Sequence, residues 1–527
     1  MMGHVEKQMT FSDYWLKGKI PDNSYWNKMR KWALENLDEK MFQPLFSYYG
    51  RPSVSPVYTF TGILVQLDKG YSDREFEGES RFDDRVKYAI TAPRDFDGID
   101  ANTLSDHRKR YFNSEIGRKI FIQTVEKARA EGMFSEENLN VIDSFMVWGA
   151  ASKQDTYTLI YQGIKMVLRF TGFYEMEKEA RDVLKRYDYD KEDKKPKIDW
   201  DSEEEKQKLL ESLVKDALSL VEHFNGKKDL PEDLKEACDL LERIARQDIK
   251  IDKDGNVSMI KGTAKDRVIS VNDPEMRHGH KTSSRNSDGY KAEIITGGKL
   301  ASVIVAVEVD GANTEDGRYM GQLIDEAKSD GTEINKLYGD SAYSDFEEME
   351  KRENEMEFCV KVRSSHNGAG GYTKDEFKIN LKKGTVTCPE GKVKKFKAKK
   401  ALKERKQVSV HFSEKTCRNC PQRAQCTQCK DGRRILIHPY EDKLQEQRIY
   451  QKTEEFKKDY SRRANGERTI SHVTAHGGRK SRYRGKKKTK WQLIMASINH
   501  NVKMLMGYIQ NKPKQDILTG GLCPQMS

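Results

Sequence analysis

Several features that mark other protein classes are missing from this sequence. No uninterrupted apolar run approaches the roughly 20 residues of a membrane-spanning helix. The N-terminal stretch MMGHVEKQMTFSDYW lacks the apolar segment of a signal peptide. A Gly-rich phosphate-binding loop and a Gly-x-Ser-x-Gly nucleophile motif are also missing, so ATP use and serine-hydrolase chemistry are not expected. We therefore expect a cytoplasmic protein without membrane contact.

The composition is that of a soluble protein with an uneven charge distribution. The chain has 527 residues, of which 36% are hydrophobic and 34% charged, and this length predicts several domains. The net charge of +11 permits nucleic-acid binding, and the segment 479–490 (RKSRYRGKKKTK) contains eight basic residues and no acid. Five of the eight cysteines lie between 388 and 429, which favours a metal site over disulfides in a cytoplasmic chain.

The hydrophobic periodicity predicts a chain that alternates between helical and β-type regions. Residues 1–135 have apolar residues at helical spacing, and so does the highly charged segment 175–251, which we expect to form an inserted helical hairpin. Strands are expected at 139–147, 267–271, 289–296, 301–309, 335–340 and 357–362, and further helices at 157–173, 315–329, 344–353, 441–476 and 489–508. This order predicts an α/β core that is interrupted by insertions.

Two aspartates lie at or near the ends of apolar strand-type runs. Asp143 is in VIDSFMV and Asp340 follows KLYG. An acid in such a place is costly to bury unless a partner or a metal compensates it. Mg²⁺ prefers oxygen ligands, and two such ions can promote phosphodiester displacement. The alternative is that either acid caps a turn or pairs with a basic side chain.

A third acid lies in a helical stripe near the C-terminus. Tyr460, Arg463, Glu467 and Thr474 are spaced 3, 4 and 7 residues apart, so they share one face of a helix. An arginine one turn before a carboxylate is a common arrangement for simple helix stabilisation, and periodicity alone favours that alternative.

The C-terminal string RRANGERTISHVTAHGGRKSRYRG resembles the final motif of bacterial insertion-sequence transposases of the DDE type. In that family the pattern is Arg-x3-Glu-x-Thr-Ile-Ser, an Arg-rich R-x-x-R-Y-R-G, and a helix that ends in Asn and a basic residue. The matching positions here are Arg463, Glu467, Thr469, Ile470, Ser471, Arg479, Arg482, Tyr483, Arg484, Gly485, Asn501 and Lys503. Tyr460, Arg463 and Glu467 also resemble the family's Tyr-Arg-Glu-Lys signature, although Thr474 replaces the final lysine.

Further blocks resemble the same family in the same order. They are 50–90 with 100–111 in the N-terminal region, 141–147 and 337–343 around the two aspartates, and 271–281 with 288–291 between them. Phe145 departs mildly from the small residue that is usual after Asp-Ser. Together the matching blocks span about residues 40 to 510.

The resemblance implies an α/β fold with an RNase-H-like mixed-sheet core. It assigns 1–135 to an N-terminal helical, DNA-binding domain, 136–174 and 261–362 to the catalytic core, and 441–510 to C-terminal catalytic helices. Between them lie a charged helical insertion (175–260) and a loop-rich, cysteine-containing insertion (363–440), and 511–527 is expected to be a flexible tail.

The same resemblance implies a metal-dependent enzyme of DNA transposition. Asp143, Asp340 and Glu467 would be its catalytic residues and the ligands of two Mg²⁺ or Mn²⁺ ions. The partners would be double-stranded DNA with terminal inverted repeats and target DNA, with a homodimer on the DNA, in the nucleoid of the cytoplasm. Two alternatives are a catalytically inactive, transposase-derived DNA-binding protein and a metal-dependent nuclease that does not join strands.

The basic tract and the cysteines add two further predictions. Tyr460, Arg463, Arg479, Arg482, Arg484 and Lys487 are expected to contact DNA, because Lys and Arg neutralise phosphates. The alternative is a solvated loop. Paired Cys-x-x-Cys knuckles suit zinc, and the resemblance favours Cys388, Cys417, Cys420 and Cys426 as ligands, with Cys429 as a rival. Free thiols or disulfides are the alternatives.

Overall fold

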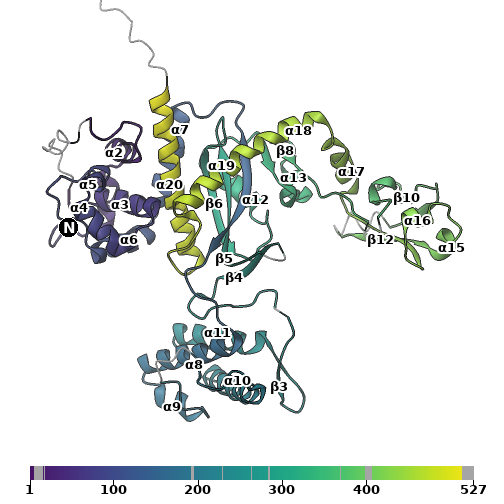
Figure 1. The fold of residues 1–527 in the computed structure, drawn as a ribbon, viewed down its shortest axis with the longest axis horizontal. Coiled ribbons are helices and arrows are strands. Elements are labelled where there is room, and N and C mark those ends of the chain that lie inside the picture. Colours follow the sequence, from purple (N-terminus) through teal and green to yellow (C-terminus); the bar gives the residue numbers. More distant parts are fainter. Residues whose placement is uncertain are drawn as a thin grey trace, which may run out of the picture.

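A central mixed sheet organises the molecule, and helices from both halves of the chain pack on it (Figure 1). The computed structural model describes residues 1–4, 16, 18–190, 195–227, 229–262, 264–282, 285–367, 370–397 and 406–512. Nearly all of the expected tail, 513–527, and Cys523 within it lie outside the described residues. Within them, none of the helices combines the length and apolarity that crossing a membrane requires.

The N-terminal region is helical, as predicted. Its α-helices are α2 (Tyr25–Asn36), α3 (Pro56–Lys69), α4 (Asp73–Phe82), α5 (Asp84–Ala89), α6 (Ala101–Phe112) and α7 (Ile116–Ala130). Helix α3 begins after the capping side chain of Ser55, and Gly70 ends it in the left-handed conformation that favours glycine. Almost every residue of α3 is buried, because it contacts the other N-terminal helices and the C-terminal helix α20 (Lys486–Asn511).

The sheet combines antiparallel and parallel pairing. Its strands are β1 (Asn140–Trp148), β4 (Arg277–Thr282), β5 (Arg285–Gly297), β6 (Val303–Gly311), β7 (Lys336–Gly339) and β8 (Glu357–Val360). Strand β5 pairs antiparallel with β1, β4 and β6, whereas β1, β7 and β8 run parallel in that order. The arrangement is compatible with an RNase-H-like core.

Both faces of the sheet are covered. On one face, Phe145 and Val147 of β1 pack with the N-terminal helices and α20. On the other face, Ile142 packs with α12 (Met320–Ser329), and α13 (Phe346–Arg352) follows β7 in the chain. Alternation along β1 therefore places Asp143 on the same face as Phe145.

The charged insertion forms a helical unit with its own apolar core. Helices α8 (Thr156–Phe173), α9 (Glu177–Asp182), α10 (Glu203–Asn225) and α11 (Glu232–Gln247) pack together, and the hairpin of β2 (Ile249–Ile251) and β3 (Val257–Met259) follows. The prediction of a strand at 267–271 was wrong, because that backbone is irregular. Val268 and Val271 are instead buried in the helical core, so the apolar run reflects packing and not strand pairing.

The cysteine-bearing region consists of short elements around a small core. Strands β9 (Lys378–Asn380), β10 (Thr385–Thr387) and β11 (Val393–Lys395) form one sheet, and β12 (Val408–Ser413) pairs with β13 (Gly432–Ile437). The single-turn helices α15 (Glu414–Cys417) and α16 (Arg423–Cys426) lie between β12 and β13 in the chain. Phe377, Phe412 and Ile435 are among the residues of its core.

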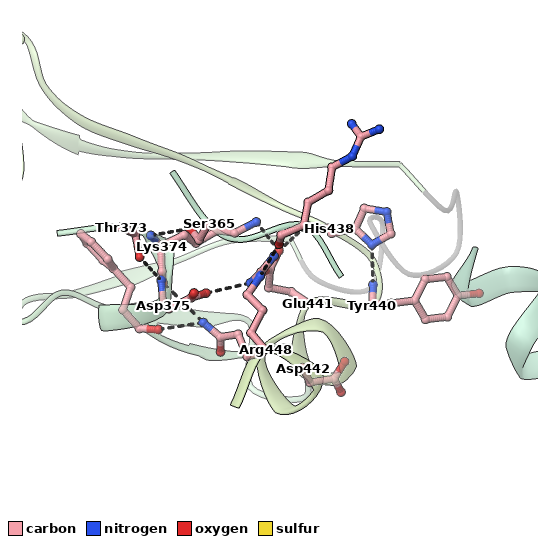
Figure 2. A network of polar contacts seen from close by, with 12 residues as sticks. Ser365, Thr373, Lys374, Asp375, His438, Tyr440, Glu441, Asp442 and Arg448 are labelled. Atoms are coloured by element: carbon pink, nitrogen blue, oxygen red, sulfur yellow. Dashed lines mark hydrogen bonds and ion pairs between the residues drawn. The ribbon is translucent and has the colours of Figure 1, made fainter. Parts of the chain in front are cut away.

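A buried ionic network connects this region to helix α17 (Glu441–Tyr450). Figure 2 shows Glu441 between Lys374 and Arg448. The Glu441 carboxylate, whose side chain is fully buried, accepts from Lys374 Nζ at 2.6 Å and from Arg448 Nη1 at 3.1 Å. Arg448 Nη1 also bonds Asp375 at 2.8 Å. Two cations therefore compensate a carboxylate that water cannot reach, as burial of a charge requires.

The helix expected at 441–476 is broken into several pieces. It consists of α17, α18 (Glu454–Tyr460), a 3₁₀ turn at Ser461–Arg463, α19 (Ala464–Val473) and a wider turn at Thr474–Gly478. Gly477 has a φ of 95°, which ends the helical path. Thr474 is thus outside α19, and its hydroxyl donates to the Ser471 carbonyl.

Helix α20 is tied to the free edge of the sheet by Asn501. The Asn501 carboxamide accepts from Ile304 N at 2.8 Å and donates to Ile304 O at 2.9 Å. Two residues further along α20, Lys503 forms an ion pair with the buried Asp68 of α3. The two positions that match the family's last motif therefore join α20 to β6 and to the N-terminal helices.

Replacing Asn501 with alanine should loosen the edge of the sheet. The substitution leaves the buried N–H and C=O of Ile304 without partners, which costs about 2–4 kcal/mol. The free energy of local opening of β6 and α20, measured by hydrogen exchange, should fall by that amount. The control Asn511→Ala, at the exposed end of α20, should leave the exchange unchanged. Equal protection of β6 in the two variants would contradict this role.

Candidate active site

Three separate elements carry Asp143, Asp340 and Glu467. Asp143 lies within β1, Asp340 directly follows β7, and Glu467 is in the first turn of α19. Strands β1 and β7 run parallel with Val141 opposite Tyr338, so each aspartate lies two residues beyond this pair on its own chain segment. The sheet therefore brings the two aspartates side by side, although they are 197 positions apart in the sequence (340 − 143).

Close packing of α19 on β1 brings the third acid to the same place. Gly466 approaches Val141 so closely that a Cβ atom at Gly466 would lie 2.6 Å from Val141 Cγ1. Val141 and Asp143 point to the same face of β1, because side chains alternate along a strand. Glu467 follows Gly466, so the helix presents its acid to the face that carries Asp143.

The side chain of Arg463 lies between two of the acids. Its Nη2 donates to Asp143 Oδ2 at 2.7 Å and its Nη1 to Glu467 Oε1 at 2.5 Å. The Arg463 side chain is 14% exposed, and its Nε is buried without a hydrogen-bond partner. One guanidinium thus links β1 to α19 and leaves one of its own donors unsatisfied.

The electrostatics of the site are those of clustered carboxylates. Burial raises the pKa of Asp143, Arg463 lowers it, and Asp340 and Glu467 raise it again, so that it lies above the usual aspartate value. Burial raises the pKa of Tyr460 to about 12; Arg463 opposes this shift, whereas Asp340 and Asp143 add to it. The negative potential of the acids therefore extends to Tyr460.

A fourth acid that the sequence analysis missed lies on the opposite face of the sheet. Glu293 on β5 is the cross-strand neighbour of Ser144 and is 2% exposed. Burial, reinforced by Asp316, raises the pKa of Glu293 to about 7. Ser144 Oγ donates to Asp316 at 2.8 Å. The single acid in the apolar run AEIIT was the available signal.

The site contains the carboxylate ligands that a divalent cation needs, but these ligands are not arranged around a common ion position. Carboxylate oxygens are the ligands that Mg²⁺ and Mn²⁺ prefer. In the part of the chain that the structure describes, no group of three or more His, Cys, Asp or Glu side chains is arranged so that it could hold a metal ion. At Asp143 and Glu467, the positive charge is supplied by Arg463.

The residues expected to contact DNA have different surroundings. The ring of Tyr460 stacks on Phe456, with ring centroids 5.3 Å apart. Arg482 Nη1 donates to the Tyr71 carbonyl at 2.6 Å, so this side chain contacts the N-terminal helical region. Arg484 and Lys487 are exposed.

Arg479 lies beside the end of β1. Its side chain is exposed and donates to the Met146 carbonyl at 3.2 Å, and its own carbonyl accepts from Trp148 N. Trp148, the last residue of β1, is 52% exposed. The basic tract therefore starts at the strand that carries Asp143.

The cysteines favoured by the sequence analysis share one cavity. The four thiols that line it belong to Cys388, Cys417, Cys420 and Cys426. Burial raises the pKa of Cys426, Arg433 lowers it, and the other three thiols raise it again. Lys392 N donates to Cys388 Sγ at 3.3 Å. Cys429 is exposed and does not line the cavity, and all of the described cysteines are free thiols.

The comparison with known families agrees with the motif that surrounds Glu467. A family model described as a transposase DDE domain matches residues 387–506. The matched segment includes α19, the basic tract and most of α20. No curated protein and no solved structure matches the chain. The match covers less than a quarter of the chain, and it supports a similarity of this segment to the DDE domain of transposases.

Proposed function

We propose that this chain cuts and joins DNA strands at the ends of a mobile insertion sequence, by cut-and-paste transposition, with Asp143, Asp340 and Glu467 as its catalytic residues. The observation that carries the proposal is the link from Asp143 through Arg463 to Glu467. It joins the strand predicted to hold the first acid to the helix that the DDE-domain match includes. The parallel pairing of β1 and β7 adds Asp340.

The architecture supports the same proposal. The parallel strands β1, β7 and β8, with β5 antiparallel to β1, are compatible with an RNase-H-like core. The two aspartates lie on neighbouring parallel strands, and the helix with Glu467 covers the face to which Asp143 points. Such a rigid frame can hold three carboxylates in a fixed geometry.

The proposed cofactors are two Mg²⁺ or Mn²⁺ ions held by Asp143, Asp340 and Glu467. When bound, such ions increase the reactivity of the attacking oxygen and stabilise the leaving oxygen. The residues of the chain would hold the ions and orient the DNA. The carboxylates provide the negative charge that the ions need, and Arg463 and Tyr460 lie beside them, where they would orient a DNA phosphate. Water would hydrolyse a phosphodiester at the end of the element and leave a 3′-hydroxyl. This hydroxyl would attack a phosphodiester of the target DNA, form the new bond and displace the 3′-oxygen of the target strand.

The proposed partners are DNA with terminal inverted repeats and target DNA. Arg479, Arg484 and Lys487 present exposed cations, Arg479 contacts the strand of Asp143, and Arg482 joins the tract to the N-terminal helical domain. We propose that these residues contact the phosphate backbone, which predicts a salt-sensitive affinity. Joining two DNA ends favours a homodimer on the DNA, in the nucleoid.

Asp340→Asn tests the catalytic assignment. The amide has nearly the same shape but lacks the negative charge that a divalent cation needs. Cleavage of repeat-ended DNA in Mg²⁺ or Mn²⁺ should fall by roughly 100-fold or more. DNA binding, followed by fluorescence anisotropy, should remain largely intact.

Asp345→Asn is the matched control for this test. Asp345 is exposed and caps α13, a role that Asn fills as well, so its cleavage rate should equal that of the unmodified chain. Retained cleavage by Asp340→Asn would remove Asp340 from the site. If the unmodified chain binds DNA but does not cleave it, the chain is a DNA-binding protein derived from a transposase. If it cleaves DNA without giving strand-transfer products, it is a nuclease.

We also propose that Cys388, Cys417, Cys420 and Cys426 hold a structural zinc ion. They come from different short elements around one cavity, and zinc would have to draw them closer together, because no three of the described side chains are arranged for a metal ion. The Lys392 N–H that points at Cys388 Sγ would stabilise a thiolate. Zinc would then connect the loops between β10 and β13, where the apolar core is small.

The thiol assignment is tested by metal content. The purified full chain should contain about one zinc per molecule, by elemental analysis, and Cys417→Ser or Cys420→Ser should lower that content and the melting temperature. Cys429→Ser is the matched control, because this thiol is exposed and outside the cavity. If Cys429→Ser lost its zinc, Cys429 would be a ligand in place of one of the four proposed cysteines. If the purified chain contained no zinc, the proposed site would be refuted.

A further inference from the structure

Arg463 occupies a position that its role in DNA contact does not explain. Its guanidinium forms hydrogen bonds with two carboxylates, Asp143 and Glu467, that the proposed function assigns to metal binding. Like-charged carboxylates at one site repel one another unless a cation lies between them. In this structure Arg463 is such a cation.

We propose that Arg463 is an internal counter-cation, which keeps the acids in a metal-free resting state and has to leave them before a divalent ion can bind. This inference rests on the proposed function, because it concerns the same site. It accounts for the finding that no described set of three ligands is arranged for a metal, although the acids converge. The guanidinium separates Asp143 from Glu467.

The contacts of Arg463 with the two acids are incomplete, which explains how it can move away from them. The Arg463 and Asp143 side chains are 14% and 16% exposed, so both charges have lost most of their hydration. Complete compensation would need every guanidinium donor to be bonded, but Nε has no partner. Glu467 is 57% exposed, so its bond to Arg463 competes with water. The ion-pair triad is therefore only partly satisfied.

The position of Arg463 in the chain gives it room to move. Arg463 ends the 3₁₀ turn Ser461–Arg463, which separates α18 from α19. The acids lie instead on a central strand and on a helix that is packed tightly against that strand through Gly466. Departure of the arginine can therefore leave the carboxylates in place.

A DNA phosphate is the chemical group most suited to draw Arg463 away. The planar guanidinium binds phosphate oxygens through two parallel hydrogen bonds, as it binds carboxylates. Transfer of Arg463 to a phosphate would free the acids and remove a positive charge from between them. DNA and the divalent ion would then bind cooperatively, and the coupling would be reciprocal. The chain would load metal mainly when DNA is present, which would limit untargeted cutting.

The test is Mn²⁺ binding to the full chain without DNA, at constant ionic strength, measured by electron paramagnetic resonance of the free ion. Arg463→Gln should bind Mn²⁺ about 10-fold more tightly than the unmodified chain, within the usual range of coupling between sites. Arg468→Gln is the matched control: it removes the same charge from α19, the helix that follows Arg463, and the Arg468 side chain donates to Asn465 and not to an acid of the site. It should change the affinity by less than about 3-fold, through long-range charge alone.

A second measurement adds a short DNA duplex. The duplex should tighten Mn²⁺ binding to the unmodified chain and to Arg468→Gln, but much less to Arg463→Gln, which has no guanidinium left to displace. Should Arg463→Gln prove unstable in thermal melts, Arg463→Lys keeps the charge without the planar fork and should give an intermediate affinity.

The outcomes separate the two proposals. If Arg463→Gln binds Mn²⁺ no more tightly than Arg468→Gln, while Asp340→Asn abolishes binding, the counter-cation role is wrong and the metal site stands. If Asp340→Asn leaves Mn²⁺ binding unchanged, the metal site itself is wrong and the role of Arg463 falls with it.

Discussion

The close approach of helix α19 to strand β1 is the contact on which the site depends. Only a residue without a side chain fits at Gly466, because Val141 lies directly against it. This contact sets the distance between a helix and a strand that are more than three hundred residues apart in the sequence. It places Glu467 and Arg463 over the face of β1 that carries Asp143, and strand pairing with β7 then adds Asp340. The arrangement of the three acids therefore follows from one packed helix and one pair of parallel strands.

The remainder of the molecule holds this frame together. Asn501 joins α20 to the edge strand β6, and Lys503 joins the same helix to Asp68 in the N-terminal helices. The helical insertion and the cysteine-bearing region each have their own apolar core, and the second is tied to α17 by the buried carboxylate of Glu441. Insertions that bring their own cores can interrupt a chain without disturbing the sheet, because they bury their apolar residues among themselves. The wide sequence separation of the three acids is therefore compatible with a compact site.

Much of this organisation could be predicted from the sequence, because strong periodicity and the family motif point the same way. The strands of Asp143 and Asp340 and the helices of the N-terminal region agree with the expectation. The strand expected at 267–271 does not exist, since Val268 and Val271 meet helices and not a neighbouring strand, and an apolar run alone cannot distinguish the two. The broken helix before Glu467, the position of Arg463 between two acids and the buried Glu293 depend on tertiary contacts. The lone acid in AEIIT and the spacing of Arg463 and Glu467 are local signals, but the partners of these side chains on other elements are not encoded locally.

The central claim is that β1, the end of β7 and α19 surround one site for divalent ions. When Fe²⁺ is bound in place of Mg²⁺, added hydrogen peroxide oxidises it and is itself reduced to hydroxide and a hydroxyl radical. The radical cuts the nearby protein backbone, so the cut positions map the ligands of the ion. With DNA present, the account predicts cuts in three separate segments, around Asp143, Asp340 and Glu467, and their loss on addition of excess Mg²⁺. Cuts near the two aspartates without any in α19, or cuts that Mg²⁺ does not suppress, would contradict it.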